Sequence, residues 1–237
     1  MNNINKIITL LLLIVAQSVI AQEEQLVTAQ QQANAFVVNH YSKAYALAQR
    51  YGDTEMAISA LYNVLAEYPQ NDSLLYTLSY LYFQNNKTAQ SVLVSQDMLK
   101  INPNHLGALE LSATGYEKLG LKDKSLDAYE SLYLQSNNFQ TLYKVAFLQF
   151  DLKRYTESNT NADILLKMPE AETLKVYYSD ENKEEKEYSI KVALINLKGL
   201  VSKAIGDNKN AKKHFEAALA IAPDFALAKQ NLEELEK

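Results

Sequence analysis

The chain contains no cysteine, and this absence removes several kinds of chemistry at once. Without a thiol there is no disulfide, no zinc–thiolate centre and no cysteine nucleophile. Tryptophan is absent too, whereas tyrosine occurs 16 times. Tyrosine is therefore the dominant large side chain of this protein.

Positive charge is also in short supply. The chain has 23 Lys and Arg against 28 Asp and Glu, which gives a formal charge of -5 and a pI of about 5.3. The basic residues are scattered, and no basic run exceeds two residues. Nucleic-acid-binding surfaces are usually clustered basic faces. We therefore expect no nucleic-acid partner.

Histidine is rare and isolated. The three histidines, His40, His105 and His214, lie far apart in the sequence, and none has a second histidine or a carboxylate at metal-ligand spacing. We interpret them as surface or packing residues.

Other motifs for chemistry are missing as well. Asp180, Asn182 and Glu184 alternate like the start of a calcium loop, but Glu185 occupies the place that needs glycine for the sharp turn. The sequence has no phosphate-binding glycine loop and no nucleophile elbow. No nucleophile is assembled with a base and a residue to orient it. We expect no enzyme activity, no cofactor and no metal.

The N-terminal segment has the pattern of a secretory signal peptide. Met1 to Lys6 is polar with one positive charge, Ile7 to Ala16 is almost wholly apolar, and Val19 and Ala21 precede a possible cut before Gln22. The apolar run is short for a membrane span, which needs about 20 residues. We predict a signal peptide at 1–21 and an exported mature chain, periplasmic or extracellular, with no membrane insertion after cleavage. An uncleaved anchor is the alternative.

The rest of the chain repeats at a fixed spacing. Pro69 and Pro103 are 34 residues apart, and apolar residues recur every three or four positions between turn signals, which is typical of paired helices. We predict one helical-repeat domain at 22–237 that opens with a helix at 24–50. Its five predicted repeats are 38–71, 72–105, 106–138, 139–170 and 192–224, followed by a capping helix at 225–237.

This pattern resembles the tetratricopeptide repeat, whose 34-residue unit has bulky, small and aromatic residues at set places, a glycine at the turn and a proline at the end. The last repeat supplies Gly199, Gly206, Ala211, Phe215, Ala218 and Pro223, and the second supplies Leu75, Leu78, Ser79, Tyr82, Ser91, Met98 and Pro103. The fourth repeat departs most, since Lys153 replaces the turn glycine. The resemblance implies an all-α, right-handed superhelix of antiparallel helix pairs. When the signal-peptide pattern is added, the sequence resembles that of an exported repeat protein of the bacterial envelope type.

One segment does not fit the repeat. Residues 171–191 add about 20 residues between repeats, and Leu174 to Tyr178 is rich in strand-forming residues before a charged stretch. Tyr188 to Ile190 then resumes the alternation. We predict a small β-hairpin at about 172–190, with a disordered charged loop as the alternative.

The resemblance also implies a concave groove lined by the first helix of each repeat. Two aromatic trios lie at groove positions of the second and fourth repeats, namely Tyr76, Tyr80 and Phe83, and Tyr143, Phe147 and Phe150. Each trio advances by three or four residues and so forms one stripe along its helix. Exposed aromatics of this kind favour binding, because they give large contact area at low entropy cost. The alternative is that neighbouring helices or the insert cover them.

Some members of this family hold a peptide carboxylate with Lys, Arg and Asn at these positions. Here the corresponding places hold Ser42, Ala46, Tyr76, Tyr80, Glu110, Thr114, Tyr143, Phe147, Asn196 and Leu200. That cationic clamp is missing, so we predict a ligand held by apolar and tyrosine contacts, with binding that depends weakly on salt. The sequence thus favours a non-enzymatic exported scaffold for protein or peptide partners. The alternative function is a carbohydrate- or small-ligand-binding protein that uses the tyrosine-rich groove.

Overall fold

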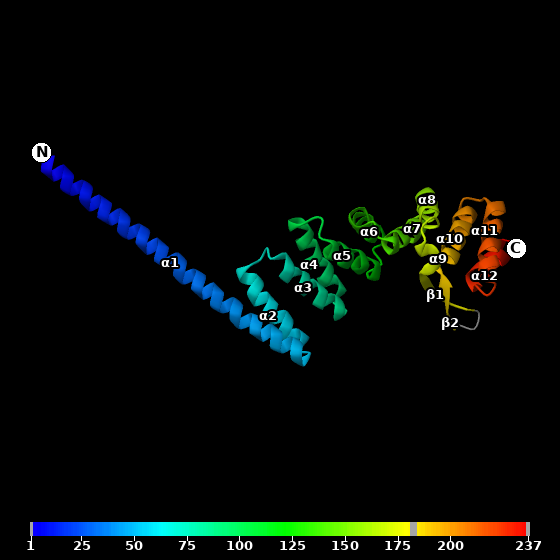
Figure 1. Ribbon diagram of the computed structural model, residues 1–237, viewed down its shortest axis with the longest axis horizontal. Helices are drawn as coiled ribbons and strands as arrows, with labels where there is room; N and C mark the ends of the chain where they lie inside the picture. The colour runs from blue at the N-terminus through cyan, green and yellow to red at the C-terminus, as the bar shows by residue number, and fades with distance from the viewer. Residues whose placement is uncertain (1, 181–183, 236–237) are drawn as a thin grey trace. The chain divides into compact units, whose positions relative to one another are not determined.

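The computed structural model describes residues 2–180 and 184–235, with side chains from Gln22 onward (Figure 1). Met1, the middle of the predicted hairpin tip at 181–183, and the last two residues of the predicted capping helix lie outside the described residues. The chain divides into two compact units, Met1–Leu81 and Tyr82–Lys237. Among the described residues, no helix has both the length and the apolar character that a membrane span requires.

The first unit is built on a long helix, α1 (Asn2–Tyr51), which is followed by α2 (Thr54–Glu67) and the first part of α3 (Asp72–Gln84). The predicted helix at 24–50 is therefore the C-terminal part of a longer one. Asp53 ends the turn and caps α2, where its side chain accepts a hydrogen bond from the backbone N–H of Met56 at 3.0 Å. The apolar face of α2 then packs on α1 through buried side chains, which are Ala57, Ile58, Leu61, Val64 and Leu65.

The second unit continues with helices packed in consecutive pairs. After the end of α3 come α4 (Thr88–Ile101), α5 (Leu106–Lys118), α6 (Lys122–Ser136), α7 (Phe139–Asp151) and α8 (Tyr155–Leu165). A short helix, α9 (Glu170–Thr173), leads into the insert. The chain then forms α10 (Ile190–Ala204), α11 (Asn208–Ile221) and α12 (Ala226–Leu235). The helices from α5 to α10 together form the main core of this unit. It includes Leu126, Leu142, Leu165 and Leu194, each at most 1% exposed.

The same backbone turn joins the two helices of every pair. One residue in each turn has a positive φ, namely Gly52, Asn86, Gly120, Lys153 and Gly206. The next backbone N–H reaches back to a carbonyl in the last turn of the first helix, as between Arg154 N and Gln149 O at 2.7 Å. Lys153, with φ of 61°, therefore adopts the left-handed conformation that glycine adopts in three of the other turns.

Several small polar residues are buried among the helices. Six serines have no exposed surface, namely Ser79, Ser91, Ser95, Ser112, Ser125 and Ser158. The hydroxyl of Ser125 donates to the carbonyl of Ala113 on the neighbouring helix at 2.9 Å. A larger side chain at such a position would push two helices apart, because helix interiors are close-packed.

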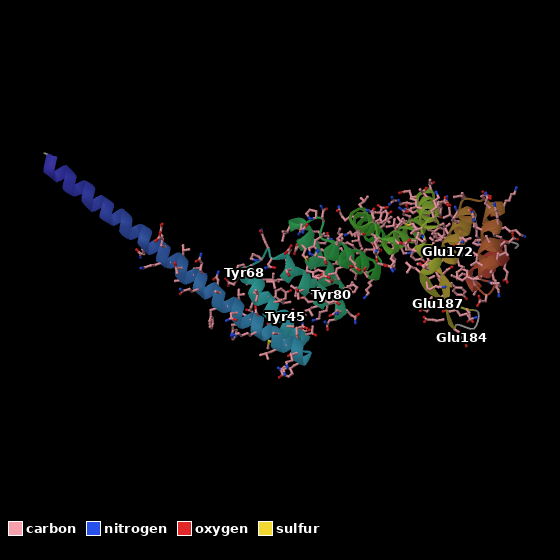
Figure 2. The ribbon with its side chains drawn as sticks, viewed as in Figure 1. Tyr45, Tyr68, Tyr80, Glu172, Glu184 and Glu187 are labelled. Carbon is pink, nitrogen blue, oxygen red and sulfur yellow. The ribbon has the colours of Figure 1, made fainter. Side chains whose placement is uncertain are left out.

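The insert is a β-hairpin, as predicted, and the disordered-loop alternative is wrong for its described residues. Strand β1 (Lys175–Ser179) pairs antiparallel with β2 (Glu185–Ser189), with Tyr177 opposite Glu187. The inner face packs on the C-terminal end of the chain, where the rings of Tyr178 and Tyr188 lie 5.4 and 4.9 Å from the buried ring of Phe225. The labelled Glu184 and Glu187 mark the outer part of the hairpin (Figure 2). The expected fold class, all-α helix pairs with one small hairpin, is confirmed.

Candidate functional site

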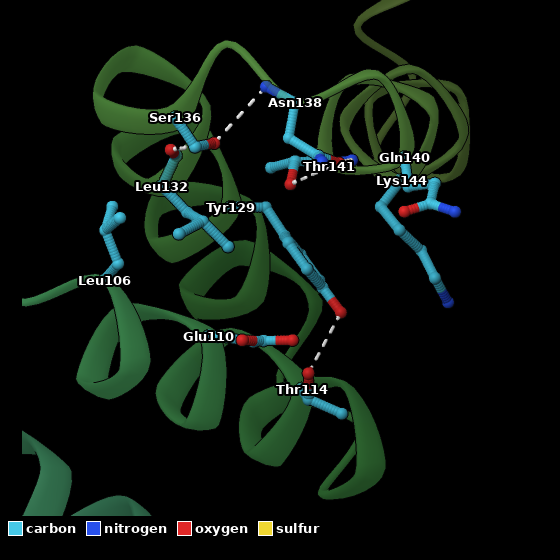
Figure 3. Close-up of a pocket in the computed structure, with 10 residues that line it drawn as sticks. All are labelled: Leu106, Glu110, Thr114, Tyr129, Leu132, Ser136, Asn138, Gln140, Thr141 and Lys144. Atoms are coloured by element: carbon cyan, nitrogen blue, oxygen red, sulfur yellow. Dashed lines mark hydrogen bonds between the residues drawn. The ribbon is translucent and has the colours of Figure 1, made fainter. Parts of the chain in front are cut away.

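A groove opens on the second unit between α5 and α7, with α6 as its floor (Figure 3). We call it the α5–α7 groove. It encloses about 340 Å³. The residues that line it come from three helices and one joint: Leu106, Glu110, Thr114, Tyr129, Leu132, Ser136, Asn138, Gln140, Thr141 and Lys144.

Helix caps fix the end of the groove where α6 meets α7. Asn137 ends α6 in the left-handed conformation, with φ of 48°. Asn138 then caps α7, since its side-chain oxygen accepts a hydrogen bond from the N–H of Thr141 at 3.1 Å. The N–H of Asn138 in turn donates to the Ser136 hydroxyl at 3.3 Å. The polar groups of Ser136, Asn138 and Thr141 at this end are therefore engaged within the chain.

Tyr129 forms the centre of the floor. It rises from α6 toward Thr114 on α5, and Glu110 lies beside its ring (Figure 3). Its hydroxyl donates to a carboxylate oxygen of Glu117 at 2.9 Å and lies 3.3 Å from the hydroxyl of Thr114. Burial, followed by the nearby charge of Glu117, raises the pKa of Tyr129 to about 12. The phenol thus stays neutral at physiological pH and serves as a fixed polar point in the groove.

The charged side chains of the groove differ in whether they already have a partner within the chain. Lys144 on α7 forms an ion pair with Glu117 at 2.8 Å, so its ammonium group is already engaged. Glu110 and Gln140 make no hydrogen bond or ion pair with any part of the chain that the structure describes. The groove therefore offers one carboxylate and one amide to a ligand, next to Leu106, which is 47% exposed.

The predicted trio on α7 lies beside this groove and does not line it. Tyr143, Phe147 and Phe150 are half-buried and pack against the core of the second unit. The hydroxyl of Tyr143 lies 3.3 Å from that of Tyr178, so the hairpin partly covers this helix face. Burial, and next the neighbouring phenol of Tyr178, raise the pKa of Tyr143 well above its ordinary value. At Tyr143, therefore, the insert covers part of the aromatic stripe, which is the alternative given from the sequence.

The trio on α3 is divided between the two units. Tyr76 and Tyr80 belong to the first unit, where their rings stack with centroids 6.2 Å apart and Tyr80 is 43% exposed. Phe83 belongs to the second unit, where the ammonium of Lys118 lies 4.1 Å from its ring centroid. Binding by these six aromatics stays a prediction.

Sequence reasoning named part of the α5–α7 groove. Glu110 and Thr114 were among the positions compared with the missing cationic clamp, and both line the groove. Gln140, Lys144 and Tyr129 were missed. The signal for Gln140 and Lys144 was present, because they stand one helical turn apart on α7, directly beside the aromatic stripe. In the described parts of the chain, no group of three or more His, Asp or Glu could hold a metal ion.

Comparison with known proteins supports the same architecture. Residues 192–225 match the family model described as tetratricopeptide repeat. No curated protein matches the whole chain or a part of it in sequence.

Several solved structures are similar in fold. A tetratricopeptide repeat protein from Parabacteroides merdae is 17% identical with a TM-score of 0.58, covering 84% of this chain and 72% of that one. MamA from Desulfovibrio magneticus RS-1 is 14% identical with a TM-score of 0.56, covering 80% and 97%. YrrB, described as having an unusual peptide-binding site, is 11% identical with a TM-score of 0.63, covering 81% and 90%. The chain therefore has the fold of tetratricopeptide-repeat proteins.

Proposed function

We propose that this protein is a non-enzymatic, exported scaffold that binds a segment of a protein partner in the α5–α7 groove. The observation that carries the proposal is the unpaired carboxylate of Glu110, placed between exposed Leu106 and the hydroxyl pair of Thr114 and Tyr129. Ligand sites typically combine apolar surface with a few convergent polar groups, and this groove combines Leu106 and Leu132 with polar side chains from three helices. YrrB, which is similar in fold, is described as having a peptide-binding site.

The chemistry of the groove specifies its occupant further. A peptide with an apolar side chain on Leu106 and Leu132 and a basic side chain at Glu110 would satisfy both kinds of surface. Because Glu110 is exposed, a single ion pair there contributes only about 0.2–1 kcal/mol. Contact with Leu106 and hydrogen bonds to the neutral polar side chains of the lining would supply most of the affinity, so we still expect weak salt dependence.

The alternative of carbohydrate binding has less support in this groove. Sugars stack on open aromatic faces, but Tyr129 is only 6% exposed. With Tyr129 as the aromatic residue of its lining, this groove offers a sugar little ring surface to stack on, which suits a peptide better.

Peptide selection followed by groove substitutions tests the proposal. We would select binders from a displayed library of random 12-residue peptides with the purified chain and measure their affinities by fluorescence polarisation. Thr114→Arg should abolish binding, because the longer side chain fills the groove and pairs with Glu110 one turn away. Glu110→Gln should weaken basic peptides about two- to five-fold.

Glu216→Gln is the matched control, since Glu216 is an exposed glutamate on α11, away from the groove. It should bind like the wild type. Circular dichroism would verify that each variant is folded. Selected peptides that bind Thr114→Arg as tightly as the wild type would contradict the proposal, and so would a failure to select any peptide.

Export is the second part of the proposal. It is supported by the order of a positively charged start, an apolar run and small residues before Gln22. The cell compartment in which this scaffold acts would then be the periplasm or the extracellular space.

A further inference from the structure

Helix α1 carries a second apolar stripe that α2 does not cover. The residues of α1 that turn toward α2 are buried or half-buried, as at Tyr41, Tyr45 and Ala48. The other stripe is exposed along its length, with Leu26 64%, Phe36 72%, Leu47 54% and Tyr51 74% exposed. We call this stripe the α1 seam. Its members are Leu26, Ala29, Ala33, Phe36, His40, Leu47 and Tyr51.

The spacing of the seam is that of a helix-pairing surface. Leu26, Ala33, His40 and Leu47 are seven residues apart, and Ala29 and Phe36 fall between them. A repeat of three and four residues keeps side chains on one face and meets a partner helix along that face. The rings of Phe36 and His40 stack at 6.2 Å with an interplanar angle of 19°, which presents a flat aromatic surface in the middle of the seam.

The charges around the seam are divided between its two ends. Glu23 lies at one end, and Lys43 and Arg50 lie at the other, with no Asp, Glu, Lys or Arg from 25 to 42. Two parallel copies would place like charges side by side. Two antiparallel copies place each acidic end against a basic end, so the helix is complementary to itself in one orientation only.

We propose that the α1 seam binds the α1 seam of a second copy of this chain in antiparallel orientation. In this arrangement Leu26 of one copy lies near Leu47 of the other, and Glu23 lies near Arg50. Phe36 lies next to the twofold axis, which passes midway between positions 26 and 47. The paired segment, about 30 residues long, spans about 45 Å of helix.

Other occupants fit the seam less well. A helix that lies on a membrane surface usually carries Lys and Arg beside its apolar face. Residues 25–42 contain neither, so lipid would gain no electrostatic attraction along most of the seam. A foreign helix would need the same charge division in reverse order, which a second copy supplies by symmetry.

Crosslinking tests the arrangement directly, because the chain has no cysteine of its own. Cells would produce the full chain in two forms with tags of different size, one with Leu26→Cys and one with Leu47→Cys. A short bismaleimide should then link the two forms to each other. Leu26→Cys alone should give little product, because equivalent positions are about 30 Å apart along an antiparallel pair. Ala33→Cys alone should link to itself, because its two copies lie only about 10 Å apart along the pair and Phe36 is kept.

A charge substitution supplies the second readout. Phe36→Glu should lower the yield of the Leu26–Leu47 product at least about tenfold, since burying a phenylalanine is worth roughly a factor of ten or more in association. Val27→Glu is the matched control, because Val27 is 56% exposed on the opposite side of the same helix. It should leave the yield unchanged.

Two results would overturn the proposal. Efficient linking of Leu26→Cys to itself would show a parallel pair, and the absence of any product with all three cysteine variants would show that the seam binds no second copy. Circular dichroism of each variant would establish that a lost product reflects lost pairing. Because the seam and the α5–α7 groove share no residue, this test is independent of the proposed function.

Discussion

We predict that the buried Tyr129, in the floor of the α5–α7 groove, makes the folded protein lose stability at high pH. Tyr129 is 6% exposed, and its pKa is raised to about 12, first by burial and then by Glu117. In the unfolded chain a tyrosine has a pKa of about 10. Below pH 10 the phenol is protonated in both states, and the stability that its neutral form contributes is fully present. As the pH rises toward 12, the unfolded state loses its proton first, so the folded state is destabilised.

The size of this loss follows from the two pKa values. Relative to its value below pH 10, the free energy of unfolding should fall by about 1.4 kcal/mol at pH 11 and by roughly 2 kcal/mol at pH 12. Tyr129→Phe removes the titrating group. At pH 8 this variant should be about 1 kcal/mol less stable than the wild type, because the hydrogen bonds to Glu117 and Thr114 are lost. Near pH 11 the two proteins should be equally stable, and above it the variant should be the more stable one.

Urea unfolding followed by circular dichroism between pH 8 and pH 11.5 would measure the crossing. Tyr177→Phe is the control, since Tyr177 is 65% exposed on the outer face of the hairpin. It should keep the wild-type dependence on pH. If the free-energy difference between the wild type and Tyr129→Phe stays constant over this range, the argument that burial holds the Tyr129 proton is wrong.

Two further predictions concern packing and export. Gly199→Ala should destabilise the chain by about 1–2 kcal/mol despite its gain in helix propensity, because the new Cβ would lie 2.5 Å from the Cδ1 atom of the fully buried Phe215 ring. Adding Phe215→Leu should recover part of the loss in urea unfolding, and a simple sum of the two single effects would contradict this account. The chain recovered from its native host should begin at Gln22 by intact-mass spectrometry, and a mature protein that retains Met1 would refute the signal prediction.

The helices could be predicted from periodicity because the same spacing of apolar and turn residues recurs in each repeat. The predicted repeat at 72–105 contains α3 and α4, and that at 106–138 contains α5 and α6. Lys153 shows why a departure from the pattern changed so little. The turn needs one residue with positive φ and a hydrogen bond back to the helix, and Lys153 provides the first while Arg154 N provides the second. Backbone hydrogen bonds thus hold a conformation that the side chain does not favour.

The site was predicted less well, because its position depends on contacts distant in sequence. An aromatic stripe at helical spacing gives no sign of what covers it. The place of Tyr143 depends on the folding back of the hairpin, whose Tyr178 lies 35 positions later. Nor could composition reveal that Glu117 engages both Tyr129 and Lys144, which leaves Glu110 as the carboxylate available to a ligand. Helix α1 is longer than the predicted helix at 24–50 because it also includes residues 2–21, for which the signal peptide stays a prediction.

The hairpin closes where it leaves the helices. The N–H of Ile190 donates to the carbonyl of Leu174 at 3.0 Å, so the two ends of the excursion meet, and α10 packs directly on α8. The packing of α8 on α10 therefore does not depend on the part of the hairpin that lies beyond the contacts of Tyr178 and Tyr188 with Phe225. The outer end of the hairpin is accordingly a natural site for grafting, where a fluorescent reporter or an epitope could be carried without altering the stacking of the repeats around it.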